Sequence, residues 1–591
     1  MTLEEPLKKI IAKGILSLYS AEIHSDLIKL ETTSKDYDGD ITFVVYPILK
    51  LSKQNPLNTA TALGNFICEQ SDDFESFNVI NGFLNIKLSP SHWANWLKVN
   101  SQCNNFGIPN LGQGKKVMVE YSSPNTNKPL HLGHVRNNLL GYSVSEILKF
   151  AGYTVIKANL INDRGIHICK SMLAWQLYGN HETPQSSGLK GDHLVGKYYV
   201  LFDQHYQSEI RSLIAGGLGE AEAKKEAPLI KKAQELLLKW EANDADTLAL
   251  WTKMNNWVYD GFEQTYKRMG VDFDKTYYES QTYLLGKDSI EDGLKRNVFE
   301  KNEDGSVWID LTEDGLDRKL VLRADGTSVY ITQDIGTAQL KYDETQMDKS
   351  VYVVGNEQDY HFKVLQLILK KLGKPYADGV YHLSYGMVDL PSGKMKSREG
   401  TVVDADELMQ EMHNTAKKIT QELGKTEGFS ELELSILHET IAMGALKYFL
   451  LKVDPVKRMM FNPEESIDFH GNTGPFIQYT HTRIRAILRN ISIAPQVSTS
   501  ALLHPADIEL IKTLSWFPDK VALAADGYNP SIVANYMFEL SKSFNRLYHE
   551  VSILGETDEA IKQNRIALCS LAGNYLKKGM QLLGISMPER M

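Results

Sequence analysis

The sequence predicts an α/β protein with a central parallel sheet, an α+β domain before it and an all-α domain after it. Strand–helix–strand patterns at residues 117–160 and 351–385 predict the sheet, because a helical crossover between two strands makes them parallel. Helical periodicity without strand alternation over residues 456–591 predicts the last domain. Two β-α-β halves around a switch point are typical of a Rossmann-like nucleotide-binding fold.

The composition favours a folded, soluble protein of several domains. The chain has 591 residues, of which 42% are hydrophobic and 9% aromatic. Its net charge of −10 argues against a protein that simply coats polyanions, although local basic patches remain compatible with nucleic-acid binding. The amino terminus lacks the apolar core of a signal peptide, and no apolar run reaches the roughly 18 residues of a membrane span. We therefore expect a cytoplasmic protein without membrane contact.

The cysteines indicate neither a zinc site nor a disulfide framework. There are four of them, scattered along the chain without C-x-x-C spacing. They are Cys68, Cys103, Cys169 and Cys569.

Residues 1–112 are expected to form the first domain. Its predicted elements are a helix at Leu3–Leu18, a strand at Thr42–Pro47, a helix at Asn58–Cys68 and a strand at Phe83–Leu88. The Asn81-Gly82 pair before the last strand is typical of a hairpin turn. A stretch rich in Asn, Gly and Gln at residues 100–114 predicts the linker to the next domain.

The central domain, residues 113–455, opens with a strand at Val117–Glu120, a polar loop and then His131-Leu132-Gly133-His134. Apolar residues on one helix face follow, and Tyr153–Leu160 is the next predicted strand. The polar loop then lies at the carboxyl end of the first strand, where α/β sheets bind ligands. A glycine for close approach, a helix amino terminus and two imidazoles suit a nucleoside triphosphate. A plain loop-to-helix turn is the alternative.

A helical, mixed-charge insertion at about residues 178–270 interrupts the central domain, and we interpret it as solvated helix faces without chemistry. After the insertion the core is expected to resume with strands near Val307–Leu311, Lys319–Leu322 and Val351–Val354. The second β-α-β unit consists of a strand at 351–354, a helix at Asp359–Leu372 and a strand at Tyr381–Tyr385. Asn162-Asp163-Arg164-Gly165, after the strand that ends at Leu160, is either part of the site or a purely structural turn.

The helical domain, residues 456–591, carries basic and aromatic residues that suit RNA loops. Helices are predicted at Gly474–Asn490, Pro505–Leu514, Pro530–Glu550 and Asp558–Leu583. The residues that supply this chemistry are Phe476, Tyr479, Arg483, Arg485, Arg489, Arg546 and Tyr548. A dimerising bundle is the alternative.

Residues 122–137, S-S-P-N-T-N-K-P-L-H-L-G-H-V-R-N, resemble the HIGH signature region of class I arginyl-tRNA synthetases. The resemblance extends to both ends of the chain. Residues 1–112 resemble the additional domain that cradles the tRNA elbow, and residues 471–484 and 582–591 resemble the anticodon-binding domain. The resemblance implies a class I synthetase fold and a ligase that forms arginyl-adenylate from ATP and L-arginine, then charges the 3′-terminal adenosine of tRNA(Arg). It also implies activation that needs bound tRNA. ATP in turn implies Mg²⁺ as part of the substrate complex. The cysteine spacing indicates no zinc, and we expect a monomer.

A selective pocket for a guanidinium needs carboxylates, because this group is a planar fork of donors. By resemblance, Glu279 and Asp334, both expected in strand-end loops, hold the guanidinium together with Tyr330. Asn125 and Gln358 are implied to hold the backbone groups of arginine.

The resemblance implies that His131, His134, Lys128, Lys394 and Ser397 are catalytic. Residues 394–400, K-M-K-S-R-E-G, resemble the K-M-S-K-S loop but have Ser397 at the position of the second lysine. Lys128, three residues before His131, is expected to supply the missing positive charge, because arginyl-tRNA synthetases without the loop lysine often carry a lysine there.

The implied ATP contacts are Ser122, His131, Gly133, His134, His361, Met387, Val388 and Lys394. Among them, His361 is expected to stack on adenine, while the backbone of Met387 and Val388 binds its edge. The implied tRNA contacts are Phe83, Asn85, Tyr479, Arg483 and Arg546. Phe83 is expected to stack on a D-loop base that Asn85 hydrogen-bonds, unless Phe83 belongs to the core.

Three other functions agree less well with the sequence. A synthetase for glutamate or glutamine needs a cationic pocket, which the acids at 279 and 334 do not provide, and one for cysteine usually uses zinc. A small nucleotidylyltransferase does not need the terminal domains. A non-catalytic tRNA-binding paralogue does not need His131, His134 and Lys394.

Overall fold

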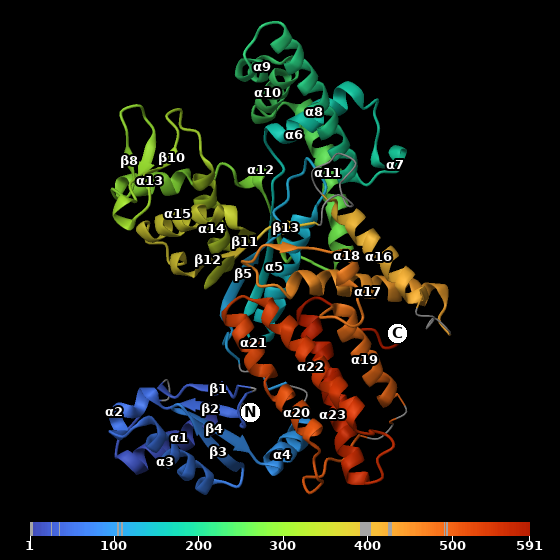
Figure 1. The fold of residues 1–591 in the computed structure, drawn as a ribbon. Coiled ribbons are helices and arrows are strands. Elements are labelled where there is room, and N and C mark those ends of the chain that lie inside the picture. Colours follow the sequence, from blue (N-terminus) through green and yellow to red (C-terminus); the bar gives the residue numbers. More distant parts are fainter. Residues whose placement is uncertain are drawn as a thin grey trace.

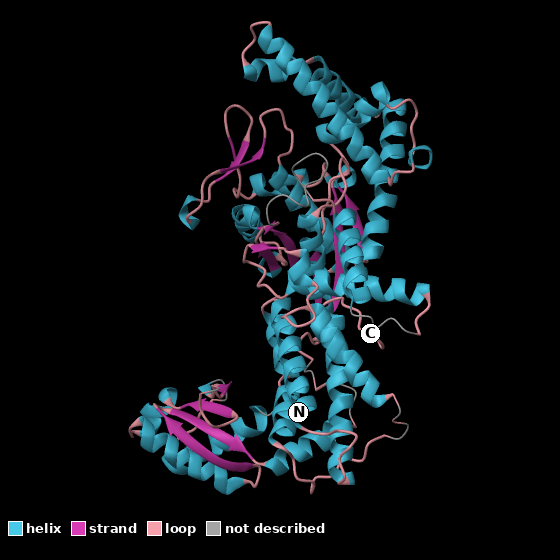
Figure 2. Ribbon diagram, turned by 45° about the vertical axis from the view of Figure 1, so that its right-hand side comes forward, coloured by secondary structure: helices cyan, strands magenta, loops and turns pink. Residues whose placement is uncertain are grey.

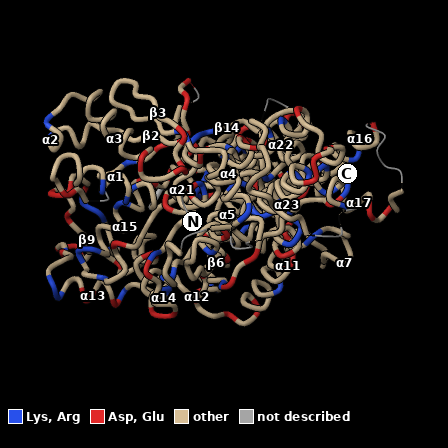
Figure 3. The backbone as a smooth tube through the Cα atoms, turned by 90° about the horizontal axis from the view of Figure 1, so that it is seen from below, with Lys and Arg blue, Asp and Glu red and all other residues tan. Residues whose placement is uncertain are grey.

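The computed structural model is elongated, with the central sheet between two helical regions (Figure 1). It describes residues 4–24, 27–34, 36–102, 106–107, 110–390, 403–422, 428–489, 491 and 494–591. Acidic and basic residues are interspersed in the view of Figure 3.

The amino-terminal domain is a four-stranded antiparallel sheet covered by helices (Figure 2). Its elements are α1 (Glu4–Tyr19), β1 (Leu30–Thr32), β2 (Ile41–Val44), α2 (Leu49–Ser52), α3 (Pro56–Gln70), β3 (Phe74–Ile80), β4 (Phe83–Leu88) and α4 (Pro90–Asn100), with strand order β1-β2-β4-β3. The predicted hairpin turn is confirmed, since Asn81 and Gly82 have φ angles of 48° and 79° between β3 and β4. Helix α3 packs closely on the sheet, because a Cβ at Gly64 would lie 2.5 Å from the Phe77 ring.

The predicted parallel sheet is confirmed in the central domain, with strand order β12-β11-β5-β6-β7. Its elements are β5 (Lys116–Glu120), α5 (Leu132–Phe150), β6 (Thr154–Ile161), β7 (Lys275–Tyr278), β11 (Lys349–Gly355), α15 (Asp359–Lys371) and β12 (Val380–Tyr385). The strand order reverses between β5 and β11, so the loops after these two strands diverge and leave the crevice in which such sheets bind ligands.

The strands predicted at Val307–Leu311 and Lys319–Leu322 are confirmed, but they do not belong to the central sheet. Three strands, β8 (Glu300–Lys301), β9 (Val307–Ile309) and β10 (Lys319–Leu322), form a separate antiparallel sheet instead. The connections between them are too short for a crossover, and parallel neighbours need a connection of about a dozen residues or more. Their buried side chains form one hydrophobic cluster with α13 (Lys287–Lys295), α14 (Tyr330–Thr345) and α15.

The insertion between β6 and β7 is helical, as predicted. It contains α6 (Ile166–Tyr178), α7 (Pro184–Ser187), α8 (Gly191–Ala215), α9 (Glu220–Glu226), α10 (Pro228–Glu241) and α11 (Ala245–Met269). Helices α8 and α11 meet at glycines, since a Cβ at Gly261 would lie 2.4 Å from the Asp192 carboxylate. The expectation of solvated faces is wrong for the inner faces of these helices: α10 and α11 contact the turn after β6, and α8 contacts residues 404 and 406.

The carboxyl-terminal part is helical, and the four predicted helices are confirmed. Its elements are α16 (Ala405–Glu422), α17 (Glu431–Leu451), α18 (Pro463–Ser466), α19 (Gly474–Leu488), α20 (Pro505–Ser515), α21 (Phe517–Asp526), α22 (Pro530–Glu550) and α23 (Glu559–Leu582). One short parallel pair, β13 (Val388–Asp389) with β14 (Met459–Met460), joins this part to the central domain. Helix α21 was not predicted, since it follows α20 after only Trp516, too close for the hydrophobic period to separate the two.

One helix, α17, is long and apolar enough to cross a membrane by length and composition. Within its most apolar stretch 67% of the residues are buried inside the protein. It packs against α5, α16, α19 and α22, as expected of a core helix.

Candidate active site

The polar loop after β5 is held in a strained conformation by groups behind it. Ser122 and Ser123 have φ angles of 78° and 46°, in the left-handed region that non-glycine residues rarely adopt. The Ser122 amide donates to Asn137 Oδ1, and the Ser122 hydroxyl is 2.7 Å from the Tyr266 hydroxyl. Ser122 is buried and supports the loop in this way, so a direct contact with ATP stays a prediction.

The two histidines of the motif orient each other. His131 precedes α5, and its Nδ1 accepts a hydrogen bond from the Gly133 amide at 3.2 Å. The His134 Nδ1 accepts from the His131 amide, also at 3.2 Å, and the ring centroids are 3.9 Å apart. Because both Nδ1 atoms accept, each neutral ring carries its proton on Nε2, where it can donate to a ligand.

Both histidines are kept neutral at physiological pH. Burial and the charge of Lys128 lower the pKa of His131 to about 4. Burial, His131 and Lys128 lower the pKa of His134 well below its usual value. Burial also lowers the pKa of Lys128. The result is a pair of uncharged hydrogen-bond donors next to a partly desolvated lysine, which suits an anionic phosphate.

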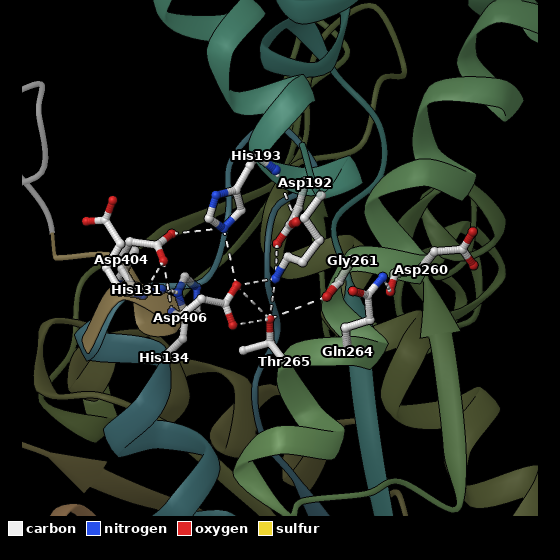
Figure 4. A network of polar contacts seen from close by, with 12 residues as sticks. His131, His134, Asp192, His193, Asp260, Gly261, Gln264, Thr265, Asp404 and Asp406 are labelled. Atoms are coloured by element: carbon white, nitrogen blue, oxygen red, sulfur yellow. Dashed lines mark hydrogen bonds and ion pairs between the residues drawn. The ribbon is translucent and has the colours of Figure 1, made fainter. Parts of the chain in front are cut away.

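A short segment after the loop of residues 394–400 lies against the histidine motif (Figure 4). Residues 403–405 pair with residues 130–132 through an antiparallel bridge between Asp404 and His131, flanked by two backbone hydrogen bonds of 2.9 Å. The loop itself lies outside the described residues. Lys394 and Ser397 are in it, so their roles stay predictions.

Charged residues of the insertion hold this segment in place (Figure 4). His193 Nε2 on α8 is 3.4 Å from Asp404 and 3.2 Å from Asp406. Lys190 forms ion pairs with Asp406 and, at 3.2 Å, with Asp192. Asp192, His193 and Asp406 are close enough to share a metal ion, but the Lys190 ammonium already neutralises two of these acids.

The predicted guanidinium pocket brings together acids from two elements. Glu279 begins α12 (Glu279–Thr282), directly after β7, as a strand-end residue should. Asp334 was expected in a strand-end loop. It lies instead in the second turn of α14, which starts at Tyr330. Tyr330 and Asp334 are four residues apart and therefore share a helix face.

The charge of Glu279 responds to its neighbours. Burial, above all, raises the pKa of Glu279 to about 7; the nearby Arg164 opposes this, and the charges of Asp163 and Asp334 add to it. A cationic ligand that neutralises this cluster therefore favours the ionised form of Glu279.

Two predicted nucleotide contacts already have protein partners. His361 Nε2 is 2.6 Å from Asp334 Oδ2, so in this structure the ring contacts a residue of the predicted guanidinium pocket, and adenine stacking stays a prediction. The Met387 carbonyl accepts a hydrogen bond from the Met459 amide at 3.1 Å. Val388 lies in β13, and its contact with adenine also stays a prediction.

The predicted contacts for the backbone of arginine lie at the crevice. Asn125 is exposed and forms a parallel bridge with Asn162, which joins the ends of β5 and β6. Gln358 is exposed in the short helix η4 (Asn356–Gln358) that follows β11. Both amides therefore lie at carboxyl ends of central strands, and their roles stay predictions.

Arg136 was missed, although it lies within the matched motif. Its side chain is fully buried and donates to the carbonyls of Gly386, Pro455 and Lys457 at 2.6, 3.2 and 3.0 Å. It thereby ties α5 to the start of the carboxyl-terminal part. The only signal for Arg136 in the sequence is an arginine within a helix that is predicted to be largely apolar.

The two predicted tRNA contacts of the first domain differ in exposure. Phe83 is 39% exposed at the start of β4, with its ring edge-on to Tyr46. Asn85 is only 1% exposed and bonds Thr42 and Asn78 at 2.6 and 2.8 Å. The burial of Asn85 conflicts with the prediction that it hydrogen-bonds a tRNA base.

A cavity of about 570 Å³ opens in the helical domain. Its lining includes Phe469, Phe476, Tyr479, Arg483, Lys542 and Met591. The Arg483 guanidinium lies 5.2 Å from the Tyr479 ring and 4.8 Å from the Tyr548 ring, and it donates to Asn545. Arg546 instead pairs with Glu550 on the exposed face of α22. The cavity thus offers aromatic faces and a fixed cation of the kind that binds an unstacked base.

Comparison with known proteins agrees with this geometry. Residues 99–462 match the family of class I tRNA synthetases (R), catalytic domain, and residues 477–591 match the DALR anticodon binding domain. The arginine–tRNA ligases of Flavobacterium psychrophilum and Bacteroides thetaiotaomicron are 55% and 51% identical to the chain, with 100% of both sequences covered in each case.

Solved structures share the same architecture. The arginyl-tRNA synthetase of Thermus thermophilus superimposes with a TM-score of 0.82 at 22% identity, and that of Plasmodium falciparum with 0.77 at 21%, each over 100% of both chains. The catalytic-domain match spans more than half of the chain, and the relatives align over its full length. The chain therefore belongs to the arginine–tRNA ligases, a family of class I aminoacyl-tRNA synthetases.

Proposed function

We infer that this chain is an arginine–tRNA ligase that makes arginyl-adenylate and pyrophosphate from ATP and L-arginine, then transfers arginine to the 3′-terminal adenosine of tRNA(Arg). One observation carries the proposal: the neutral histidines follow β5 and the acidic residue Glu279 follows β7, so both lie at the carboxyl edge of the same parallel sheet. The first suits a phosphate and the second a guanidinium. Exchange of pyrophosphate into ATP, dependent on arginine and tRNA, tests it.

The activation step needs no protein nucleophile. The arginine carboxylate attacks the α-phosphorus of ATP in line, the bond to the bridging oxygen breaks, and pyrophosphate leaves. The Nε2–H groups of His131 and His134 donate to the phosphate while Lys128 offsets developing charge. Mg²⁺ enters with ATP as part of the substrate complex.

Recognition of arginine depends on Glu279 and Asp334 for the guanidinium, with Tyr330 beside them. Asn125 and Gln358 are proposed to hold the amino and carboxylate groups. A side-chain amide or ammonium lacks the planar fork of donors that two carboxylates bind, which supports selectivity without an editing site.

The KM for arginine is expected to fall as pH rises toward 7 and to level off above it. Glu279 is protonated below its pKa of about 7 in the empty pocket and attracts the guanidinium only when ionised. The affinity should therefore change by up to about tenfold per pH unit below 7. Pyrophosphate exchange between pH 5.5 and 8 measures the profile, and Glu279→Gln is the control that should flatten it. A wild-type KM that is constant over this range contradicts the assignment.

The helical domain is proposed to bind the tRNA anticodon, and its cavity to take an unstacked base. Arg483→Ala should raise the KM for tRNA about tenfold, the effect of losing one base–side-chain stacking contact. The KM values for arginine and ATP at saturating tRNA should stay unchanged. Arg318→Ala, which removes an exposed arginine paired with Glu300 in the catalytic domain, is the matched control. Equal KM values for tRNA in the two variants would contradict the proposal that the cavity belongs to the tRNA-binding surface.

Further features are part of the proposal. We propose a cytoplasmic monomer without zinc, with domain boundaries near residues 112 and 455. The cysteines support the absence of zinc, since burial raises the pKa of both Cys169 and Cys569 to about 12, which disfavours the thiolate that zinc needs.

A further inference from the structure

The turn after β6 is tied directly to the guanidinium pocket. Asp163 in this turn is 1% exposed, and its carboxylate accepts hydrogen bonds from the Ser280 amide at 2.8 Å and the Ser280 hydroxyl at 2.7 Å. Ser280 follows Glu279 in the chain. The carboxylate of Asp163 therefore fixes the first turn of α12, on which Glu279 is carried.

The helical insertion holds Asp163 from the other side. Tyr259 on α11 donates to the Asp163 carboxylate at 2.9 Å. Trp251 and Asn255 on the same helix donate to the Asp163 carbonyl at 2.7 and 3.2 Å. These three residues are spaced four apart and so form one face of α11. The face is directed at a single residue of the catalytic domain.

The guanidinium of the neighbouring Arg164 is held by two aromatic rings and a carboxylate. Its guanidinium carbon lies 3.8 Å from the Tyr283 ring centroid and 5.3 Å from that of Trp240, and it forms an ion pair with Glu241 at 3.0 Å. Trp240 and Glu241 belong to α10 of the insertion, whereas Tyr283 follows α12. Arg164 thus joins the insertion to the element that carries Glu279.

We propose that Asp163 and Arg164 are positioning residues for arginine recognition: Asp163 fixes the backbone of Glu279, and the two charges tune, in opposite directions, how strongly Glu279 attracts a guanidinium. The proposal rests on the proposed function, in which Glu279 binds arginine. It gives the insertion a part in selecting the amino acid, because α10 and α11 hold both residues.

The groups around Glu279 have charges that permit this tuning. Arg164 lowers the pKa of Glu279, while Asp163 and Asp334 raise it. Asp334 is itself paired with His361. The nearby tyrosines 259 and 278 have raised pKa values, by burial first and then by the charge of Asp163, and stay neutral near pH 7. Removing either charge of the pair should therefore act on the ionisation of Glu279.

The test measures arginine binding to the full-length protein by calorimetry between pH 5.5 and 8. Asp163→Asn keeps the shape of the side chain and removes its charge, so the midpoint of the affinity profile should move down by about one pH unit. Arg164→Leu should move it up by a similar amount. Asp292→Asn and Arg296→Leu, which break an exposed pair with a 3.2 Å contact at the end of α13, should leave the profile unchanged.

Opposite shifts cannot arise from general loosening of the fold, which acts in one direction on both variants. Shifts of the same sign, or none beyond the control pair, overturn the proposal. If Asp163→Asn does not fold, Arg164→Leu and Ser280→Ala decide, the latter by a loss of affinity at pH 8, where Glu279 is ionised. If Glu279→Gln binds arginine with wild-type affinity and pH dependence, the pocket assignment itself fails, and this outcome is distinct from failure of the positioning pair.

Discussion

Lys128→Ala is expected to lower kcat for arginine activation by about two to three orders of magnitude, with a smaller change in the KM for ATP. A fixed cation aimed at charge that develops on the phosphate acts on the transition state more than on the bound substrate. The structure places Lys128 close enough to lower the pKa of His131 and His134. The turn is also held from behind, since a Cβ at Gly196 of α8 would lie 2.9 Å from Pro129 Cδ.

Lys396→Ala is the matched variant for this prediction. Lys396 is one position away from the place at which the K-M-S-K-S pattern has its second lysine, and its loss should have a much smaller effect. Both variants are measured by tRNA-dependent pyrophosphate exchange at saturating arginine. A severe defect in Lys396→Ala beside a silent Lys128→Ala would assign the compensating charge to the loop instead.

Asp334→Asn is expected to lower kcat/KM for arginine, with a loss of transition-state stabilisation of about 2–3 kcal/mol, within the range for a hydrogen bond to a charged group. The amide oxygen still accepts the hydrogen bond that His361 donates, so the variant should keep its fold and lose only the charge-assisted pair with the guanidinium. The KM for ATP should change little.

Glu279→Gln should show a comparable loss in arginine kinetics. Because Glu279 and Asp334 interact, the two substitutions are not expected to be additive, and the double variant measures the coupling. Near wild-type arginine kinetics in both single variants would place the guanidinium site elsewhere.

Local pattern is sufficient to predict the elements that organise the site. The apolar period after His131 ends at Gly152, which has a φ angle of 90°, and α5 ends at Phe150. The strand patterns at β5 and β11 are hydrophobic runs of the length that a buried parallel sheet needs. Motif order then identifies the carboxyl ends of these strands as the ligand-binding edge.

What escapes prediction depends on contacts between distant segments. The residue pattern of β9 and β10 predicts strands but does not indicate which sheet they join. The turn residues Asp325 and Gly326, shortly before Tyr330, predict a loop and give no sign that a helix begins at Tyr330. Asn85 looks like an outward polar residue, but its partners Thr42 and Asn78 come from two neighbouring strands.

The insertion is the clearest case of contacts that the sequence does not predict. Its mixed charge is typical of solvated helices, and no local signal shows that Lys190 and His193 face Asp404 and Asp406, more than 200 residues away. The same holds for Tyr259 and Asp163. Such partners follow from the tertiary fold alone, since charged residues on a helix give the same pattern whether they face water or another segment.

The central claim, that one crevice activates arginine with ATP and passes it to tRNA, is tested most directly by pyrophosphate exchange in the full-length protein. Labelled pyrophosphate should enter ATP when arginine and tRNA(Arg) are both present. Glutamate, glutamine or cysteine in place of arginine should give no exchange. Active, pure protein that exchanges pyrophosphate with another amino acid, or that binds tRNA(Arg) yet exchanges with none, would contradict the account.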